Sequence, residues 1–469
     1  MNSSRPANAS ATHRPRLLVA LLLLGVLTIL LLAVGPAAMA DPKGIIADFA
    51  ATPSWVQSLA GPAAASDGAT DVIMLKRDVI LVLGTLSNAG GDTDISLSKY
   101  TGDVKQWTKV WDGPGLGIDT ARKMVLSSDG KWVYICGSST KAAANSDLYV
   151  LKRSAKNGNL AWAKKYDGPA HMNDLAIAIG VDAKDNVVAA AWSQSAADID
   201  YAVTSWTKTG AKRWTWRWNG GAGNDLPFDL YVEPNGKSYV TGIMAVSGGK
   251  AAAGTARLSA TGGKLWAKKY LGPENLGAGG STMVGRPGGG VYIGGAVARA
   301  ATGNDGVLMR YSGTGSRSIV AIDDGSGGAS NELWWDITVT STKAIVCGGS
   351  TQSGGLTHPR ACIYRPDGTT VFEGTKMGAW SDAFTTVAAD AFGGWYVAGT
   401  NHTAAAIQHV YVYRSSLLSN AGVWACEWGG ATDGNAPAAM AVYDTSCALV
   451  GQWNGGATGI DQMVMMFNY

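Results

Sequence analysis

The sequence predicts an all-β protein, a single eight-bladed β-propeller built from four-stranded antiparallel blades. Three observations lead to this fold. A tryptophan recurs at intervals of about 52 residues, and eight such intervals nearly fill residues 53–469. Each interval contains four short β-prone segments separated by turn residues. No segment after residue 40 keeps the 3.6-residue apolar period of an amphipathic helix.

The repeat is clearest where the phrase LAWAKKYDGP (160–169) returns as KLWAKKYLGP (264–273). Two of the eight repeat positions hold Ser318 and Phe372 instead of tryptophan. A repeat of roughly 40 to 50 residues is typical of propeller blades rather than of helical arrays. We therefore interpret the recurring tryptophans as structural residues: Trp55, Trp107, Trp162, Trp214, Trp266 and Trp424.

Residues 162–213 show the four segments of one repeat in order. WAKKY (162–166) alternates aromatic residues with lysine, as expected for a strand at the outer rim with one wet side. AIAIGVD (176–182) and VVAAAWS (187–193) are mostly apolar, as expected for strands that are buried on both faces between neighbouring blades. YAVTSW (201–206) and its turn then lead to the next tryptophan.

The order of segments also predicts how the ring closes. The repeats begin on a tryptophan segment, SWVQSL (54–59), and stop after a third strand, QMVMMFNY (462–469). If the tryptophan segment is outermost, the last three segments lack an outer strand. We predict that residues 54–59 complete the eighth blade beside the C-terminal strand, which hides an otherwise open sheet edge.

Residues 1–40 have the pattern of a secretory signal peptide. Three arginines precede the apolar run Leu17–Val34, and Ala38-Met39-Ala40 forms a small-residue cleavage site. Cleavage would leave residues 41–52 as a linker and residues 53–469 as the propeller. The run of about 18 apolar residues is borderline for a membrane span, so a retained anchor stays an alternative. We expect a secreted or cell-surface protein with no stable membrane span after cleavage.

Charge and cysteine content limit the classes of partner and site. Without the three arginines of residues 1–40, 35 bases face 35 acids, and a neutral chain gives no reason to expect nucleic acid as a partner. The five cysteines match no zinc-binding spacing. Cys347 and Cys362 lie on consecutive predicted strands and are a candidate disulfide, whereas Cys136 is expected to be a free buried thiol.

Acidic residues are the remaining candidates for a site. An aspartate recurs before the first strand of most repeats, and it is either a turn residue bonded to backbone N–H groups or one of a ring of carboxylates that binds a cation. We favour the turn residue. The loops GGDTD (90–94), AADID (196–200) and GND (303–305) resemble short calcium loops without their full ligand spacing. We predict no catalytic residue, metal ligand or cofactor. The recurring residues are Asp67, Asp119, Asp174, Asp225, Asp382 and Asp433.

The repeat unit resembles the SBBP-type β-propeller repeats of secreted bacterial proteins. The segments YTGDVKQW (100–107), KTGAKRW (208–214) and TGGKLW (261–266) also resemble the tryptophan-docking motif of propellers of the pyrroloquinoline-quinone type. The second resemblance implies that each tryptophan packs against the neighbouring blade. The chain departs from quinone dehydrogenases because it has no adjacent cysteine pair.

Two functional hypotheses follow. The first is an exported, non-enzymatic and monomeric binding or scaffold module whose ligand is a protein, a glycan or the cell envelope. The alternative is an enzyme with its site at the channel mouth, such as a lyase, a hydrolase or a quinone-dependent dehydrogenase. An asymmetric cluster of ionisable residues at one mouth would favour the enzyme.

Overall fold

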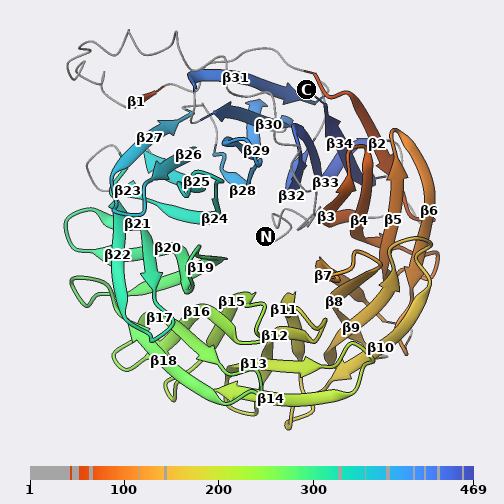
Figure 1. Ribbon diagram of the computed structural model, residues 1–469, viewed down its shortest axis with the longest axis horizontal. Coiled ribbons are helices and arrows are strands. Elements are labelled where there is room, and N and C mark those ends of the chain that lie inside the picture. Colours follow the sequence, from red (N-terminus) through yellow and green to blue (C-terminus); the bar gives the residue numbers. More distant parts are fainter. Residues whose placement is uncertain are drawn as a thin grey trace, which may run out of the picture.

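The computed structural model describes residues 43–44, 52–62, 67–115, 117–141, 145–325, 330–353, 355–376, 381–404, 407–416, 419–429, 434–456 and 459–468. The predicted signal peptide lies outside these residues. Every described element is a β-strand, and eight sheets surround a central opening (Figure 1). No helix within these ranges is long and apolar enough to cross a membrane.

The first four blades follow the chain, each running from its innermost to its outermost strand. Blade 1 holds β3 (Gly68–Lys76), β4 (Val79–Ser87), β5 (Thr93–Thr101) and β6 (Val104–Trp111). Blade 2 holds β7 (Asp119–Leu126), β8 (Trp132–Thr140), β9 (Ser146–Ser154) and β10 (Leu160–Tyr166). Blade 3 holds β11 (Asp174–Val181), β12 (Val187–Gln194), β13 (Ile199–Trp206) and β14 (Lys212–Trp218). Blade 4 holds β15 (Asp225–Val232), β16 (Ser238–Val246), β17 (Lys250–Leu258) and β18 (Lys264–Tyr270).

The other four blades repeat this order with small additions. Blade 5 holds β19 (Ala278–Gly285), β20 (Val291–Arg299), β21 (Gly303–Tyr311) and β22 (Arg317–Asp323), and β23 (Ser330–Asn331) pairs with β21. Blade 6 holds β24 (Leu333–Val339), β25 (Ile345–Ser353), β26 (Leu356–Tyr364) and β27 (Thr370–Thr375). Blade 7 holds β28 (Phe384–Ala389), β29 (Gly394–Ala404), β30 (Ile407–Ser416) and β31 (Ser419–Trp428). Blade 8 holds β32 (Ala436–Tyr443), β33 (Ser446–Gly456), β34 (Gly459–Phe467) and, as its outer strand, β2 (Trp55–Leu59).

The prediction of ring closure is confirmed. β2 pairs antiparallel with β34, with Trp55 opposite Met466 and Leu59 opposite Gln462. Within the segment expected to be a linker, β1 (Lys43–Gly44) pairs in parallel with β27 at Glu373 and Gly374.

The apolar core lies between blades rather than within them. Each of eight clusters of buried side chains combines residues from two neighbouring blades. Tyr134 of blade 2, for example, shares a cluster with Val187 of blade 3. The middle strands therefore lose the polar alternation that a strand with one wet face would show.

Outer-strand tryptophans contact the turn between the third and outer strands of the following blade. The indole Nε1 atoms of Trp107, Trp162, Trp214 and Trp266 donate to backbone carbonyl oxygens at 3.1, 3.2, 3.0 and 3.1 Å. The acceptors are Lys156, Lys208, Ala260 and Gly313 respectively.

Glycine and a basic residue complete this contact. Gly262 has a positive φ of 84°, and a Cβ atom there would lie 2.6 Å from the Trp214 ring. Arg213 Nη2 donates to the same Ala260 oxygen as Trp214, at 2.8 Å. We call this arrangement, in which an indole and a basic side chain hold the next blade's turn, the tryptophan latch.

The remaining repeat positions differ from this arrangement. Trp55 stacks on Tyr100 of blade 1 with ring centroids 6.2 Å apart. Phe372 packs on Trp395 of blade 7 at 5.2 Å, and Ser318 accepts a hydrogen bond from Arg310 Nε. Trp424 lies on β31 opposite Arg414, and its side chain is outside the described residues.

Deleting residues 53–59 should destabilise the ring strongly, because it removes β2 and exposes the edge of β34. We expect a loss of several kcal/mol, or a fall in Tm of the order of 10 °C, with increased aggregation. Ser58→Ala, an exposed change on the same strand, is the control. A deletion variant with the same thermal unfolding curve as this control would contradict the closure.

Trp214 variants should separate the two parts of the tryptophan latch. Trp214→Phe keeps a ring but loses the Nε1 hydrogen bond and should cost about 1 kcal/mol. Trp214→Ala also loses the packing and should cost about 3 kcal/mol, measured by urea unfolding. Phe392→Ala, a site that is 58% exposed, should change stability by less than about 0.5 kcal/mol. If Trp214→Ala is as mild as this control, the latch contributes nothing.

Candidate functional site

One face of the ring carries the loops that precede each innermost strand and the loops between second and third strands. We call it the loop face. The recurring aspartates fix its backbone: Asp174 Oδ2 accepts from Gly168 N at 2.6 Å, and Asp67 accepts from Gly61 N and Ser87 N at 2.5 Å. The interpretation as turn residues is confirmed for these positions.

The other members of the recurring set are arranged in the same way. Asp119, Asp225 and Asp382 are buried and accept from the backbone N–H groups of Gly113, Gly220 and His402. Asp433 lies outside the described residues. Each of these acids ties described backbone of the segment that enters a blade to nearby backbone.

Every innermost strand contains a β-bulge within its first four residues. The register shifts between residues 69 and 71 in β3, for example, and between residues 121 and 123 in β7. A bulge changes the direction in which side chains point, and in each strand it does so for two residues. The first residue after each bulge forms a ring around the opening: Asp71, Lys123, Ala178, Asp229, Thr282, Asp336, Thr386 and Ala439.

Three buried acids of this ring bind backbone with both carboxylate oxygens. Asp71 accepts from Val72 N at 3.0 Å and from Met124 N of the next blade at 2.8 Å. Asp229 accepts from Leu230 N and Met283 N at 2.9 and 2.7 Å. Asp336 accepts from Ile337 N and Val387 N, both at 2.9 Å. These acids join adjacent innermost strands.

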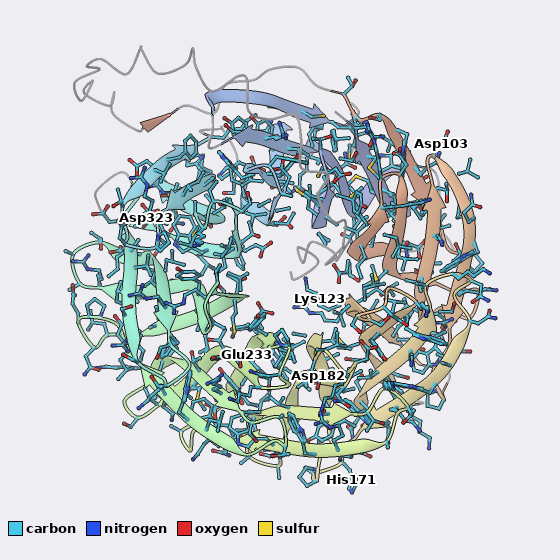
Figure 2. All side chains as sticks on the ribbon, viewed as in Figure 1. Asp103, Lys123, His171, Asp182, Glu233 and Asp323 are labelled. Carbon is cyan, nitrogen blue, oxygen red and sulfur yellow. The ribbon has the colours of Figure 1, made fainter. Side chains whose placement is uncertain are left out.

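The same position carries a charge of the opposite sign in blade 2. Lys123 is half-buried and extends from β7 toward the central opening (Figure 2). Burial raises the pKa of Asp229 to about 6 and also raises the pKa of Asp336. The ring thus combines basic, acidic and neutral residues without symmetry.

Sequence reasoning missed these ring acids, although a signal was present. Asp71 and Asp229 each follow a recurring aspartate, Asp67 and Asp225, by four residues. An acid four residues after the recurring aspartate occurs in few repeats. This departure from the repeat pattern indicates the position of the ring residue.

The bulged residues themselves differ from blade to blade. Arg122 and Thr385 are exposed, and Trp335 is 45% exposed. Because the faces of a blade are covered by its neighbours, exposed side chains of innermost strands reach solvent at the opening. A shallow pocket also lies on the loop face, formed by residues 194–199 and Asn224.

Three groups of Asp, Glu or Cys side chains in the described part of the chain have the spacing of metal ligands. Asp323, Cys362 and Glu373 surround Arg360, whose Nε lies 2.6 Å from Asp323 Oδ2. Asp147, Asp167 and Asp174 form the second group. Asp94, Asp112 and Asp119 form the third, and it includes the end of the predicted acidic loop GGDTD.

The other acidic loops have internal partners. Asp198 of AADID accepts from Ser195 Oγ at 2.8 Å, and Asp200 pairs with Arg217 at 2.9 Å. Asp305 of GND pairs with Arg299 at 3.4 Å. These contacts agree with the expectation of structural loops at both places.

The cysteines are all buried free thiols in the structure. Cys347 and Cys362 lie directly opposite each other on β25 and β26, which places their Cα atoms about 4.5–5.5 Å apart. Burial raises the pKa of both thiols. The structure therefore does not contain the candidate disulfide but has the required strand register, and the bridge stays a prediction.

No family model and no curated protein matches the chain. Solved structures of low identity do. Sqt1 from Saccharomyces cerevisiae is 10% identical, with a TM-score of 0.53 over 87% of this chain and 100% of that one. Sqt1 from Chaetomium thermophilum is 11% identical, with a TM-score of 0.54 over 86% and 97%.

A quinohemoprotein alcohol dehydrogenase, ADHIIG from Pseudomonas putida HK5, is 9% identical, with a TM-score of 0.50 over 88% of this chain and 76% of that one. What these proteins share with the chain is the propeller fold. Identities this low carry no function across, because one fold serves many functions.

The stability of the protein should depend on the ionisation of Asp229. Its folded-state pKa of about 6 exceeds the ordinary 3.8, so its stabilising contribution is present at low pH and is lost as pH rises through about 6. Asp229→Asn cannot ionise. The stability advantage of the natural protein over this variant should therefore shrink by about 2 kcal/mol between pH 4.5 and 7.5.

Urea unfolding at several pH values measures this difference. Asp229→Ala should show the same pH dependence with a larger overall loss of stability, because it also lacks any hydrogen-bond acceptor. A difference that stays constant or grows with pH would contradict the raised pKa.

Proposed function

We propose that this chain is an exported, non-enzymatic β-propeller that binds a ligand outside the cell through its loop face. The observation that carries the proposal is a difference between two sets of residues at the central opening. The ring acids bind backbone with both oxygens, whereas the bulged residues beside them vary between blades and are exposed at Arg122, Trp335 and Thr385. Fixed backbone with varied side chains is typical of a recognition surface.

The hydrogen bonds that buried carboxylates make to described loops of this face support binding rather than movement. Buried carboxylates at Asp67, Asp119, Asp174 and Asp225 hold successive loops to the strands. A surface that is already ordered loses little conformational entropy when a ligand binds. The exposed aromatic Trp335 and the cation Arg122 supply apolar and polar contacts at the opening.

Export and the class of ligand rest on the sequence. The signal-like residues 1–40 and the resemblance to SBBP-type repeats support a secreted or cell-surface protein. Balanced charge over the rest of the chain favours a protein, glycan or envelope ligand over nucleic acid. Closure covers the edge of β34 with β2 and so removes one edge on which a second copy could pair, which supports a monomer.

The enzyme hypothesis ranks second. The ionisable ring is asymmetric, as an enzyme would require, but a carboxylate whose two oxygens both accept backbone hydrogen bonds is poorly placed to exchange protons with a substrate. Lys123 is the ring residue that an enzymatic site would use first.

Binding assays with the chain from residue 41 onward test the proposal. We expect a ligand on a glycan array or in cell-envelope protein fractions, and the two sources distinguish a glycan from a protein partner. Arg122→Ala combined with Trp335→Ala should weaken binding at least about tenfold. Lys131→Ala combined with Phe392→Ala changes exposed residues at the opposite ends of innermost strands and should leave binding unchanged. Equal effects of the two pairs would overturn the assignment of the face, and turnover of a bound substrate would overturn the non-enzymatic role.

A further inference from the structure

The group Asp94, Asp112 and Asp119 lies on the loop face where blade 1 meets blade 2. Asp94 is in β5, Asp112 follows β6, and Asp119 begins β7. One oxygen of each carboxylate lies within 4.8 Å of the others. Asp94 and Asp119 are 7% and 0% exposed, whereas Asp112 is exposed and leaves the group open to water on one side.

The group lacks an internal counter-charge. Asp94 Oδ2 accepts from Asn88 Nδ2 at 3.3 Å, but Asp94 Oδ1 is buried and has no hydrogen-bond partner within the described ranges. The Oδ1 atom of the neighbouring Asp92 is also buried without a partner. No described Lys, Arg or His forms an ion pair with any of these acids. An uncompensated buried carboxylate is costly, so the site favours an added cation.

The boundary between blades 2 and 3 shows what occupies this place in another pair of blades. Asp147, Asp167 and Asp174 correspond to Asp94, Asp112 and Asp119 in the repeat. There, Lys165 Nζ lies 3.0 Å from Asp147 Oδ2 and 2.9 Å from Asp167 Oδ2. The fold therefore seats a cation between the first two acids of such a group.

Strand register identifies the residue that replaces this lysine in blade 1. Lys165 lies opposite Tyr149, two residues after Asp147, and Val110 lies opposite Ser96, two residues after Asp94. Val110 is 48% exposed and has no charge. Of the three groups with metal-ligand spacing in the described chain, the other two pair with Lys165 and Arg360, and this group has no base.

We propose that Asp94, Asp112 and Asp119 bind a Ca²⁺ ion that takes the place of the missing lysine. All the donors are oxygens, which calcium prefers. Two ligands on opposite sides of a calcium ion lie about 4.8 Å apart, twice the usual bond length, so these oxygens fit one ion. Water completes the coordination on the side of Asp112. The expectation from sequence that no metal is bound is replaced at this place, and the proposal does not depend on the proposed function.

Calorimetry and thermal unfolding of chelator-treated protein, titrated with CaCl₂ or MgCl₂, test the site. We expect one Ca²⁺ per chain, a rise in Tm of a few degrees at millimolar calcium, and a weaker response to Mg²⁺. Asp112→Asn should weaken calcium binding at least about tenfold. Val110→Lys should abolish the calcium response and raise the Tm of the metal-free protein, because the new ammonium group supplies the charge.

Asp167→Asn is the matched control, since it alters the equivalent acid in the group that already holds Lys165. It should leave the calcium titration unchanged. The proposal fails if the natural protein binds no calcium, or if Asp112→Asn and Val110→Lys both keep its response. A response to Mg²⁺ as strong as that to Ca²⁺ would overturn the choice of metal. Circular dichroism of each variant verifies that the fold is intact.

Discussion

The pairing of β2 with β34 is the contact on which the rest of the ring depends. No blade has a core of its own, because each apolar cluster is shared by two neighbours. An open row of eight blades would leave two apolar faces in water. Closure between Trp55 and Met466 converts these two exposed ends into one more buried boundary.

Within the closed ring, symmetry and asymmetry serve different purposes. The recurring aspartates and the tryptophan latch repeat because neighbouring blades meet with the same geometry at each boundary. The positions at and after the bulge vary because all eight blades together bound the central opening. The residues around it therefore need not be the same in each blade. Variation at the exposed bulged residues Arg122, Trp335 and Thr385 therefore costs the scaffold little and is available for recognition.

The architecture was predictable because its signals are local and recur. Tryptophan spacing set the phase of the repeat, and the unpaired segment at residues 54–59 indicated the closure that the strand register confirms. The opposite placement of Cys347 and Cys362 followed from the same phase. These inferences needed only the order and character of the strands.

The site residues were harder to predict for a physical reason. A bulge reverses which face a residue occupies, so alternation alone does not show that Asp71 rather than Thr70 bonds to the next blade. The group at Asp94, Asp112 and Asp119 comes from two strands and a loop, shared between two blades. The loop GGDTD contains only part of this group. The significance of Val110 becomes clear only when it is compared with Lys165, its equivalent in blade 2.

The one-strand offset between the sequence repeat and the blade has a mechanical consequence. Each repeat, from one tryptophan to the next, supplies the outer strand of one blade and three strands of the following blade. A force that extracts one repeat must therefore tear strands from two sheets at once. Repeats cannot peel away singly, as they would in a linear array of independent modules, so the ring should resist shear until it ruptures as a whole.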